Sequence, residues 1–503
     1  MLNNLKALVI VLTLSLLVFH FGKPICLRFM REEDFNTRRT VWIGLTIAVF
    51  ASPSFWLYVA VAIPLLLWGS RKESNPLALY LLALYAAPNV SFYIPVVGIN
   101  QLFDLNNRRL LAFCILIPLL LRARQTADPR NPDRMAAADF FVVAYCLLQV
   151  VLHAPYESVT SIGRRAFLLY LDLVLPYYVF SRAFKSADSL RDGLATFVLA
   201  CALLAPVGMF ESLKGWLLYV GAGDRWGAVQ EFAWLMRAGA LRAQASTGHS
   251  LTLGFLCAFG FGYWLYLARS QVSKLYVIAV GLWMWVGLMA AYSRGPWIIA
   301  VLFMFTYFLL MPSGVSRVIK TSLGFAAVGM LLMLTPMGDR IIAALPFVGT
   351  VDAENVSYRM LLLETSLRLI QEKPWFGDLF VTNKMEHLRQ GQGIIDIVNG
   401  YLVAALFYGL VGLSFVVGFL VSSTFRAYMG SRRARPVDQE LSLLGSSLVA
   451  AMLCSMVYIA MAGFEPVMWL FAGMCVSYSR VVARQMAPSR VRAPVQSSLT
   501  AAR

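Results

Sequence analysis

A series of apolar runs, several of them long enough to cross a lipid bilayer as helices, divides this chain from Ala7 to Val482. A hydrocarbon core about 30 Å thick needs about 20 apolar residues in a helix. Of the 503 residues, 59% are hydrophobic and 14% are charged, and the mean hydropathy of +0.69 is far above that of soluble globular domains. No large polar segment interrupts the series. The sequence therefore predicts an all-α, polytopic membrane helical bundle of about 12–15 transmembrane helices.

The boundaries of the runs predict how the chain is organised. The stretch from Val41 to Trp68 could form one long tilted helix or two helices that turn near Ser52. The first run lacks a small-residue cleavage site, so we expect a retained helix rather than a signal peptide. The runs lie near residues 5–22, 41–52, 54–69, 76–88, 107–121, 137–152, 165–182, 192–212, 251–268, 275–291, 297–311, 321–336, 398–421, 441–462 and 467–483. The expected regions are amino-terminal helices at 1–190, a core at 191–425, carboxyl-terminal helices at 426–485 and a cytoplasmic tail at 486–503.

The net charge of +17 indicates topology rather than a nucleic-acid partner. No stretch interleaves basic residues with exposed aromatic residues on a soluble platform, as nucleic-acid binding would require. Lys and Arg accumulate in the cytoplasmic loops of membrane proteins. The arginine-rich segments at 122–134, at 426–436 and after Arg480 fall on one side of the membrane if the helices alternate between them. That side is then the cytoplasm, and two longer loops, 213–250 and 337–398, lie outside.

Patterns that would bind a metal ion or a nucleotide cofactor are missing from the sequence. The seven cysteines stand singly, without Cys-x-x-Cys spacing, and are expected to be small apolar residues of the helices. There is no His-Glu-x-x-His pattern, paired-aspartate sugar-nucleotide signature, phosphate-binding P-loop or glycine-rich dinucleotide loop. The sequence therefore favours a group transfer that uses neither a metal ion nor a cofactor.

Several arginines are exceptions to the orientation rule, because they lie near outer helix ends or in the outer loops. They are Arg108, Arg109, Arg164, Arg165, Arg242, Arg294 and Arg359. An arginine at membrane depth costs about 2.5–3.5 kcal/mol on insertion scales, so each of them needs a partner. For a single arginine that partner could be a lipid phosphate or one of the acids Asp104, Asp172 and Asp352. For the whole set we favour a phosphate or pyrophosphate ligand, which the planar guanidinium binds in bidentate fashion.

Candidate acids and bases near the outer boundary are few. His249, at the start of a helix, could transfer protons or form a hydrogen bond at the helix end. Asp396 stands where a long helix re-enters the membrane and could be a helix cap or a general base. Asp172 follows Arg165 by two helical turns, which favours an ion pair between these two residues. The other candidates are Glu211, Glu354, Glu364 and His387.

The second outer loop is predicted to contain an amphipathic helix that lies on the outer face of the bundle. Its apolar positions, at three- and four-residue spacing, are Met360, Leu363, Leu367 and Ile370, and Pro374 ends the pattern. The simpler interpretation is a lid that packs this apolar face on the bundle. A catalytic role for the loop is the alternative.

Three segments, in this order and at this spacing, carry a resemblance to a known family. They are "LRAQASTGHSLTLG" around Arg242, "AYSRGPWIIA" around Arg294 and "SYRMLLLETSLRLIQEKPWFG" around Arg359. Over about residues 190–425 the chain resembles the O-antigen ligase and O-antigen polymerase family. The resemblance implies a metal-independent glycosyltransferase at the periplasmic face of the bacterial inner membrane, whose substrate is an oligosaccharide on undecaprenyl pyrophosphate. It also implies that the three arginines hold the pyrophosphate leaving group while a general base activates the acceptor hydroxyl.

The chain departs from the ligase pattern at the start of the re-entering helix. Ligases of lipid A-core have His-Asn there, whereas this sequence has Val398 before Asn399. Asp396 is the nearest titratable residue, so we expect Arg242, Arg294, Arg359 and Asp396 to form the catalytic set. Further substrate contacts are expected from Arg109, Arg165, Glu211, His249, Ser293, Asn399 and Tyr401.

The missing histidine favours a polymerase of exopolysaccharide or O-antigen repeat units over a ligase, which is the close alternative. A flippase or other transporter of lipid-linked oligosaccharide is a third hypothesis. A transporter should place charged groups along its path on both sides of the membrane, whereas the unusual arginines here cluster outside, and no inverted repeat is detectable. A non-catalytic subunit of an export assembly is a fourth hypothesis. Expected partners are the lipid-linked oligosaccharide, membrane lipid and other polysaccharide-assembly proteins.

Overall fold

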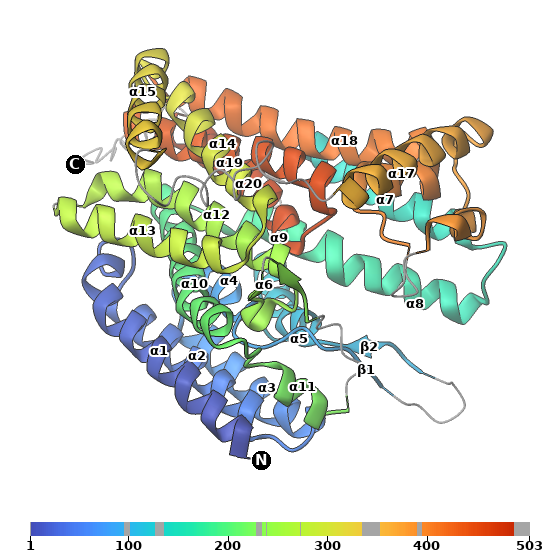
Figure 1. Ribbon diagram of the computed structural model, residues 1–503, viewed down its shortest axis with the longest axis horizontal. Helices are drawn as coiled ribbons and strands as arrows, with labels where there is room; N and C mark the ends of the chain where they lie inside the picture. The colour runs from blue at the N-terminus through green and yellow to red at the C-terminus, as the bar shows by residue number, and fades with distance from the viewer. Residues whose placement is uncertain are drawn as a thin grey trace, which may run out of the picture.

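A computed structural model describes residues 2–94, 101–125, 135–227, 234–237, 239–271, 273–333, 353–389 and 395–486, and within them the chain is almost entirely helical (Figure 1). The strands in these ranges form two short antiparallel pairs, β1 (Phe92–Tyr93) with β2 (Asp104–Leu105) and β3 (Met236–Arg237) with β4 (Ala240–Leu241). Seven of the described helices are long and apolar enough to cross a membrane, and three shorter apolar helices accompany them. The predicted all-α, multi-pass membrane bundle is thus confirmed at the level of fold class.

The helices follow one another along the whole described chain. The first group is α1 (Leu2–Cys26), α2 (Glu32–Ala51), α3 (Phe55–Lys72), α4 (Pro76–Ala83), α5 (Asn107–Leu111), the π-helical turn η1 (Ala112–Leu116), α6 (Ile117–Gln125), α7 (Ala137–His153), α8 (Val159–Leu169), the π-helical turn η2 (Tyr170–Val174) and α9 (Leu175–Ala183). The second group is α10 (Ala187–Lys214), α11 (Val220–Arg225), the 3-10 turn η3 (Ala245–Thr247), α12 (Ser250–Leu267), the 3-10 turn η4 (Ala268–Ser270), α13 (Lys274–Ala290), α14 (Arg294–Leu310) and α15 (Gly314–Met333). The last group is α17 (Ala353–Glu372), the 3-10 turns η5 (Val381–Lys384) and η6 (Glu386–Leu388), α18 (Gly400–Ala434), α19 (Gln439–Ala462) and α20 (Pro466–Gln485).

The stretch from Val41 to Trp68, for which the sequence allowed one helix or two, forms two helices joined by a turn. Helix α2 ends at Ala51, and α3 begins at Phe55. The hydroxyl of Ser54 caps α3 by accepting a hydrogen bond from the backbone N–H of Leu57 at 3.3 Å. Pro53, which lacks an N–H and disfavours a helical residue before it, explains why the chain turns here. The hairpin alternative is therefore correct.

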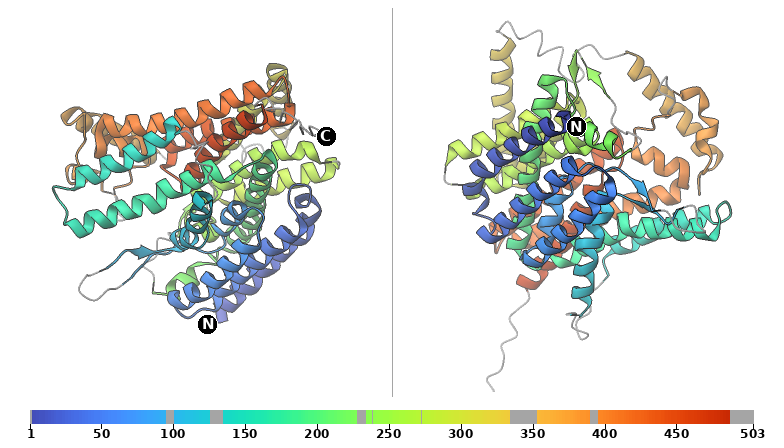
Figure 2. Two further views of the ribbon diagram at one scale, coloured as in Figure 1. Left: turned by 180° about the vertical axis from the view of Figure 1, so that it is seen from behind. Right: turned by 90° about the horizontal axis from the view of Figure 1, so that it is seen from below.

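Contacts between helix ends define two opposite ends of the bundle. At the first, Arg28 donates to the carbonyl of Ser270 at 2.7 Å, and Arg269 forms an ion pair with Glu440 at 3.5 Å. This end, which includes the arginine-rich turn between α18 and α19, is called the arginine-rich end. At the opposite end, the Asn4 side chain donates to the carbonyl of Gly221 at 3.0 Å. This loop end carries α8, α11, α17 and the β1–β2 pair, away from the carboxyl terminus (Figures 1 and 2).

The segment that follows α4 leaves the helical conformation while it is still inside the protein. An apolar run predicts a helix over about residues 76–88, but α4 ends at Ala83. Backbone groups at membrane depth need partners within the protein, because lipid supplies none. The hydroxyl of Ser246 donates to the carbonyl of Tyr85 at 2.5 Å, and the amide of Asn107 donates to the carbonyl of Ala83 at 3.3 Å. Residues 84–91 are thus an irregular, mostly buried segment that leads toward the loop end.

The predicted amphipathic helix of the second outer loop is present as α17, but a different face is buried. Leu362 and Leu369 pack on the protein, whereas Met360 and Leu367 are 64% and 51% exposed. Leu363 is also exposed, and Ile370 is half-buried. The expectation that the whole predicted apolar stripe packs on the bundle is therefore wrong, because the bundle covers only the neighbouring side of the helix.

A turn after α17 is wedged into a break in α18. At Gly409 the backbone of α18 is not helical, with φ of 67°. The carbonyls of Pro374 and Trp375 accept hydrogen bonds from the N–H groups of Leu410 and Val411, at 2.7 and 3.2 Å. The loop carbonyls replace the helical partners that the break removes. A Cβ at Gly409 would lie 2.2 Å from the carbonyl oxygen of Trp375, so the close approach requires glycine.

We predict that Gly409→Ala destabilises the protein, by about 1–3 kcal/mol for the positive φ alone, since the added Cβ also strikes the backbone of Trp375. The measurement is thermal unfolding of the purified protein in detergent. The matched control is Gly324→Ala, because nothing lies within 4 Å of a Cβ there and Gly324 is inside helix α15. Equal melting temperatures for the two variants would contradict the wedge.

Candidate functional site

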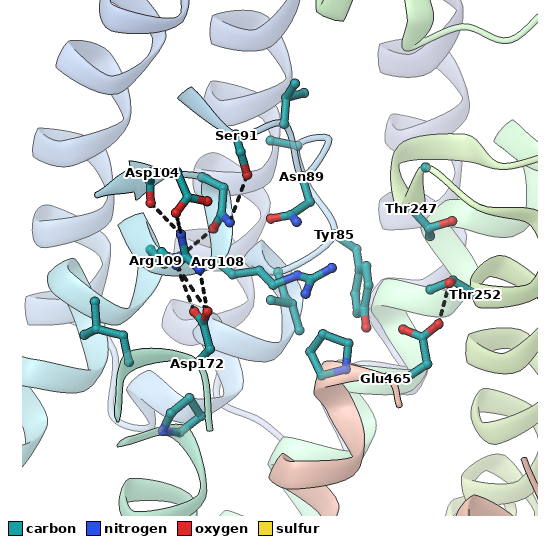
Figure 3. Close-up of a pocket in the computed structure, with 18 of the residues that line it drawn as sticks. Tyr85, Asn89, Ser91, Asp104, Arg108, Arg109, Asp172, Thr247, Thr252 and Glu465 are labelled. Atoms are coloured by element: carbon teal, nitrogen blue, oxygen red, sulfur yellow. Dashed lines mark hydrogen bonds and ion pairs between the residues drawn. The ribbon is translucent and has the colours of Figure 1, made fainter. Parts of the chain in front are cut away.

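A cavity of about 960 Å³ lies at the loop end, where segments far apart in the sequence meet (Figure 3). The irregular segment after α4 forms one wall, and α5 and the π-helical turn η2 form another. The start of α12 and the start of α20 complete the lining. Polar and charged side chains project into this space from each wall, including Arg108, Asp172, Thr252 and Glu465, and His249 also lines it.

Arg109 is held by two carboxylates at one wall of the cavity. It forms ion pairs with Asp104 at 2.5 Å and with Asp172 at 2.6 Å. The predicted pair between Asp172 and Arg165 is wrong, because Arg165 pairs instead with Glu157. Asp172 and Arg165 do line one surface groove, but the Asp172 carboxylate forms its ion pair with Arg109, and Arg165 forms its own with Glu157. Two of the outer arginines are therefore neutralised within the protein.

Arg108 extends into the cavity from the position next to Arg109. Its guanidinium points toward Tyr85 and Glu465 (Figure 3). Among the residues that the structure describes, it has no hydrogen-bond or ion-pair partner, and the hydroxyl of Tyr85 has no partner there either. A half-buried guanidinium that faces a polar cavity is suited to bind an anionic or hydroxylated ligand.

Glu465 supplies a carboxyl group on the opposite wall. It lies in the turn between α19 and α20 and accepts a hydrogen bond from the hydroxyl of Thr252 at 2.6 Å. Burial raises the pKa of Glu465 above its ordinary value, although the Thr252 hydrogen bond and the positive charge of Arg108 both act to lower it. A carboxylate with a raised pKa in a cavity is a candidate general base. Sequence analysis missed Glu465, although an acid alone in a short outer turn, before Pro466, is a usable signal.

His249 links the cavity to the arginines beside it. Its Nδ1 accepts a hydrogen bond from the N–H of Leu251 at 3.2 Å and caps α12, while its ring lines the cavity. Burial lowers the pKa of His249, the positive charge of Arg242 lowers it further, and the charge of Asp396 raises it. The helix-end hydrogen bond expected for this residue is therefore present. The two charged neighbours lie close enough for their fields to reach the imidazole.

Arg242 and Arg294 are brought to the same part of the loop end by the β3–β4 pair. The N–H of Ala243 donates to the carbonyl of Ala290 at 3.1 Å, which ties β4 to the turn that precedes Arg294. The Nε of Arg242 is buried and has no partner within the described ranges. Burial and the positive charge of Arg237 lower the pKa of Arg242 to about 10. A half-buried guanidinium beside a second cation favours an anion at this position.

Glu211 holds the loop that carries Arg242. Its carboxylate has 0% exposure and accepts hydrogen bonds from the N–H groups of Leu218, Gln244 and Ala245 at 2.9, 2.9 and 2.8 Å. These backbone donors occupy both carboxylate oxygens. Glu211 thus holds the loop that carries Arg242 in place and does not line the cavity.

The start of α18 shows which residue caps this helix. The side-chain oxygen of Asn399 accepts hydrogen bonds from the N–H groups of Tyr401 and Leu402, at 2.9 and 3.3 Å. The interpretation of Asp396 as the helix cap is therefore wrong. Asp396 is exposed, and its N–H donates to the hydroxyl of Tyr358 on α17 at 3.1 Å.

Three other predicted site residues lie away from the cavity lining. The hydroxyl of Tyr401 donates to the carbonyl of Met456 at 2.9 Å, between α18 and α19. Ser293 is buried at the start of α14 and forms no capping hydrogen bond. Arg359 is exposed on α17. Of the eleven predicted site residues, the cavity lining therefore includes Arg109 and His249, and Arg242 and Asp396 act on His249 from nearby.

We predict that Asn399→Ala lowers the free energy of unfolding by about 1 kcal/mol, because two backbone N–H groups lose their acceptor. Asp396→Ala should change it by less than about 0.5 kcal/mol, since its exposed side chain caps no helix. Denaturant unfolding of both variants in detergent provides the comparison. A larger loss in Asp396→Ala than in Asn399→Ala would contradict the assignment of the cap.

No protein-family model matches the sequence, and a search of curated proteins finds no match either. In the described part of the chain, no three His, Cys, Asp or Glu side chains gather as metal ligands would, and all seven cysteines are buried. The class that fold and site define is thus a multi-pass, helical membrane protein with a charged cavity at one end of its bundle.

Proposed function

We propose that this protein is a bacterial inner-membrane glycosyltransferase that polymerises exopolysaccharide or O-antigen repeat units carried on undecaprenyl pyrophosphate. The proposal rests on the family resemblance of the three arginine-bearing segments together with the chemistry of the cavity. The loop end would face the periplasm, because the arginine-rich turn between α18 and α19 lies at the other end of the bundle. Transfer of the glycan to lipid A-core remains the close alternative.

The observation that carries the proposal is the meeting of Arg108 and Glu465 in one cavity, with Arg242 beside it. A glycan has many hydroxyl groups, and a polar cavity of about 960 Å³ can hold several sugar rings. The pyrophosphate would lie toward Arg242 and Arg294, because the buried Nε of Arg242 has no partner in the described ranges. Cations held in this way stabilise negative charge without a metal ion.

The transfer forms one carbon–oxygen bond and breaks another. A hydroxyl oxygen of the acceptor sugar attacks the anomeric carbon of the lipid-linked donor, and its proton passes to the carboxylate of Glu465. The bond from the anomeric carbon to the phosphate oxygen breaks, and the undecaprenyl pyrophosphate leaves with the electron pair. Arg242 and Arg294 neutralise the charge that develops on this leaving group. Asp396 remains a second candidate for the base, because its field reaches His249.

We predict that Glu465→Gln reduces glycan polymerisation by about 10²–10⁴-fold, the usual contribution of a general base. The amide keeps the shape of the side chain and its bond to Thr252 but cannot accept the proton. The measurement is glycan chain length from membranes supplied with lipid-linked repeat units. Glu364→Gln, an exposed change on α17, is the matched control and should leave chain length unaltered. If Glu465→Gln still produced long chains and Asp396→Asn produced none, the general base would be Asp396 rather than Glu465.

The pH dependence of the unsubstituted protein provides a second prediction. A general base must be ionised, and burial raises the pKa of Glu465. Activity should therefore fall, as the pH is lowered, at a higher pH than an ordinary glutamate would give. This acid limb should disappear from the residual activity of Glu465→Gln. If the fall in activity at low pH stayed unchanged in Glu465→Gln, a group other than Glu465 would be responsible for it.

A further inference from the structure

Helix α17 exposes an apolar stripe that no described part of the protein covers. Met360, Leu363 and Leu367 follow one another at three- and four-residue spacing, and all three are exposed. They lie beside the face with Leu362 and Leu369 that packs on the bundle. The apolar sector of the helix is therefore wider than the protein surface on which it rests.

The remaining face of α17 is mostly polar, although Leu361 is also exposed there. Glu364, Arg368 and Gln371 are exposed there, at the same three- and four-residue spacing. The helix thus has three sectors, of which one touches the protein, one is apolar and exposed, and one is polar and exposed. A helix that lies in the plane of a membrane surface needs these last two sectors side by side.

The turn after α17 carries large exposed aromatic side chains. Trp375, Phe376 and Phe380 are 65%, 54% and 52% exposed. Tryptophan is enriched where the hydrocarbon of a bilayer meets its headgroups, because its ring is apolar and its N–H is polar. Side chains of this size, exposed together in water, would be costly.

The break in α18 sets the depth of this turn. Counting about 20 residues outward from Arg426, the first basic residue near the arginine-rich end, brings the outer hydrocarbon boundary to about residues 406–409. The carbonyls of Pro374 and Trp375 are bonded to α18 just there. The outward face of α18 below this point exposes the lipid-facing side chains Leu410, Val417, Val421 and Phe425. The turn is therefore bonded to α18 at Leu410, where this exposed face begins, and Trp375 beside it is exposed as well.

We infer that α17 and the turn at residues 374–380 form an interfacial element that lies in the outer leaflet of the bilayer, with Met360, Leu363, Leu367 and Trp375 in contact with acyl chains. The occupant of the stripe is lipid, because the stripe continues the surface that α18 presents to the membrane. The wedge at Gly409 fixes the depth of the element. This inference does not depend on the proposed enzymatic activity.

The test compares two faces of α17 in the full-length protein. Leu367→Cys and Arg368→Cys are successive positions, about 100° apart around the helix, and each is labelled with a fluorescent maleimide. The proteins are placed in vesicles of phosphatidylethanolamine and phosphatidylglycerol, with or without a nitroxide on the acyl chain near the headgroup. Because all seven native cysteines are buried, the unsubstituted protein gives the labelling background.

We expect acyl-chain nitroxide to quench the label at residue 367 at least about two-fold more than the label at residue 368. Met360→Cys should follow Leu367→Cys, which guards against a local disturbance at one position. Equal, weak quenching at residues 360, 367 and 368 would overturn the inference by placing the stripe in water. Weak quenching at 360 and 367 together with cross-linking between copies through these positions would overturn it in favour of a protein contact.

Discussion

The interior of a membrane supplies no water, so every backbone group inside this bundle must find its partner within the chain. Helices satisfy their own backbone groups along most of their length. Two segments of the described ranges leave the helical conformation inside the bundle. Residues 84–91 and the break at Gly409 expose N–H and carbonyl groups that distant segments satisfy. Each departure thus joins a transmembrane segment to a loop at the same end of the bundle.

The joined segments are the ones that build the candidate site. The bond from Ser246 to the unwound segment fixes the start of α12 against the cavity wall, and Glu211 fixes the loop before it. The loop carries Arg242, and α12 contributes His249 and Thr252. The hydrogen bonds that satisfy these backbone groups therefore also position the side chains of the candidate site. The charges of those side chains are themselves costly to bury.

Periodicity and hydropathy predicted the helices well, because each transmembrane run contains its own signal. At residues 52–54 the sequence left a single tilted helix and a hairpin open, and the structure shows the hairpin. Pairing of charges could not be predicted in this way. The partners of Arg109 and Glu465, at Asp172 and Thr252, lie 63 and 213 residues away in the sequence. The exposed stripe of α17 had the right period, but the sequence does not distinguish lipid from protein as its neighbour.

The central claim is that the cavity at the loop end holds the glycan of a pyrophosphate-linked lipid. Its most direct test is a cryo-electron microscopy structure of the protein in a lipid nanodisc with an undecaprenyl-linked repeat unit whose scissile oxygen is replaced by a methylene group. The account predicts phosphate density beside Arg242 and Arg294, and sugar density between Arg108 and Glu465. A headgroup bound at the arginine-rich end, or at the loop end with no sugar in the cavity, would contradict it.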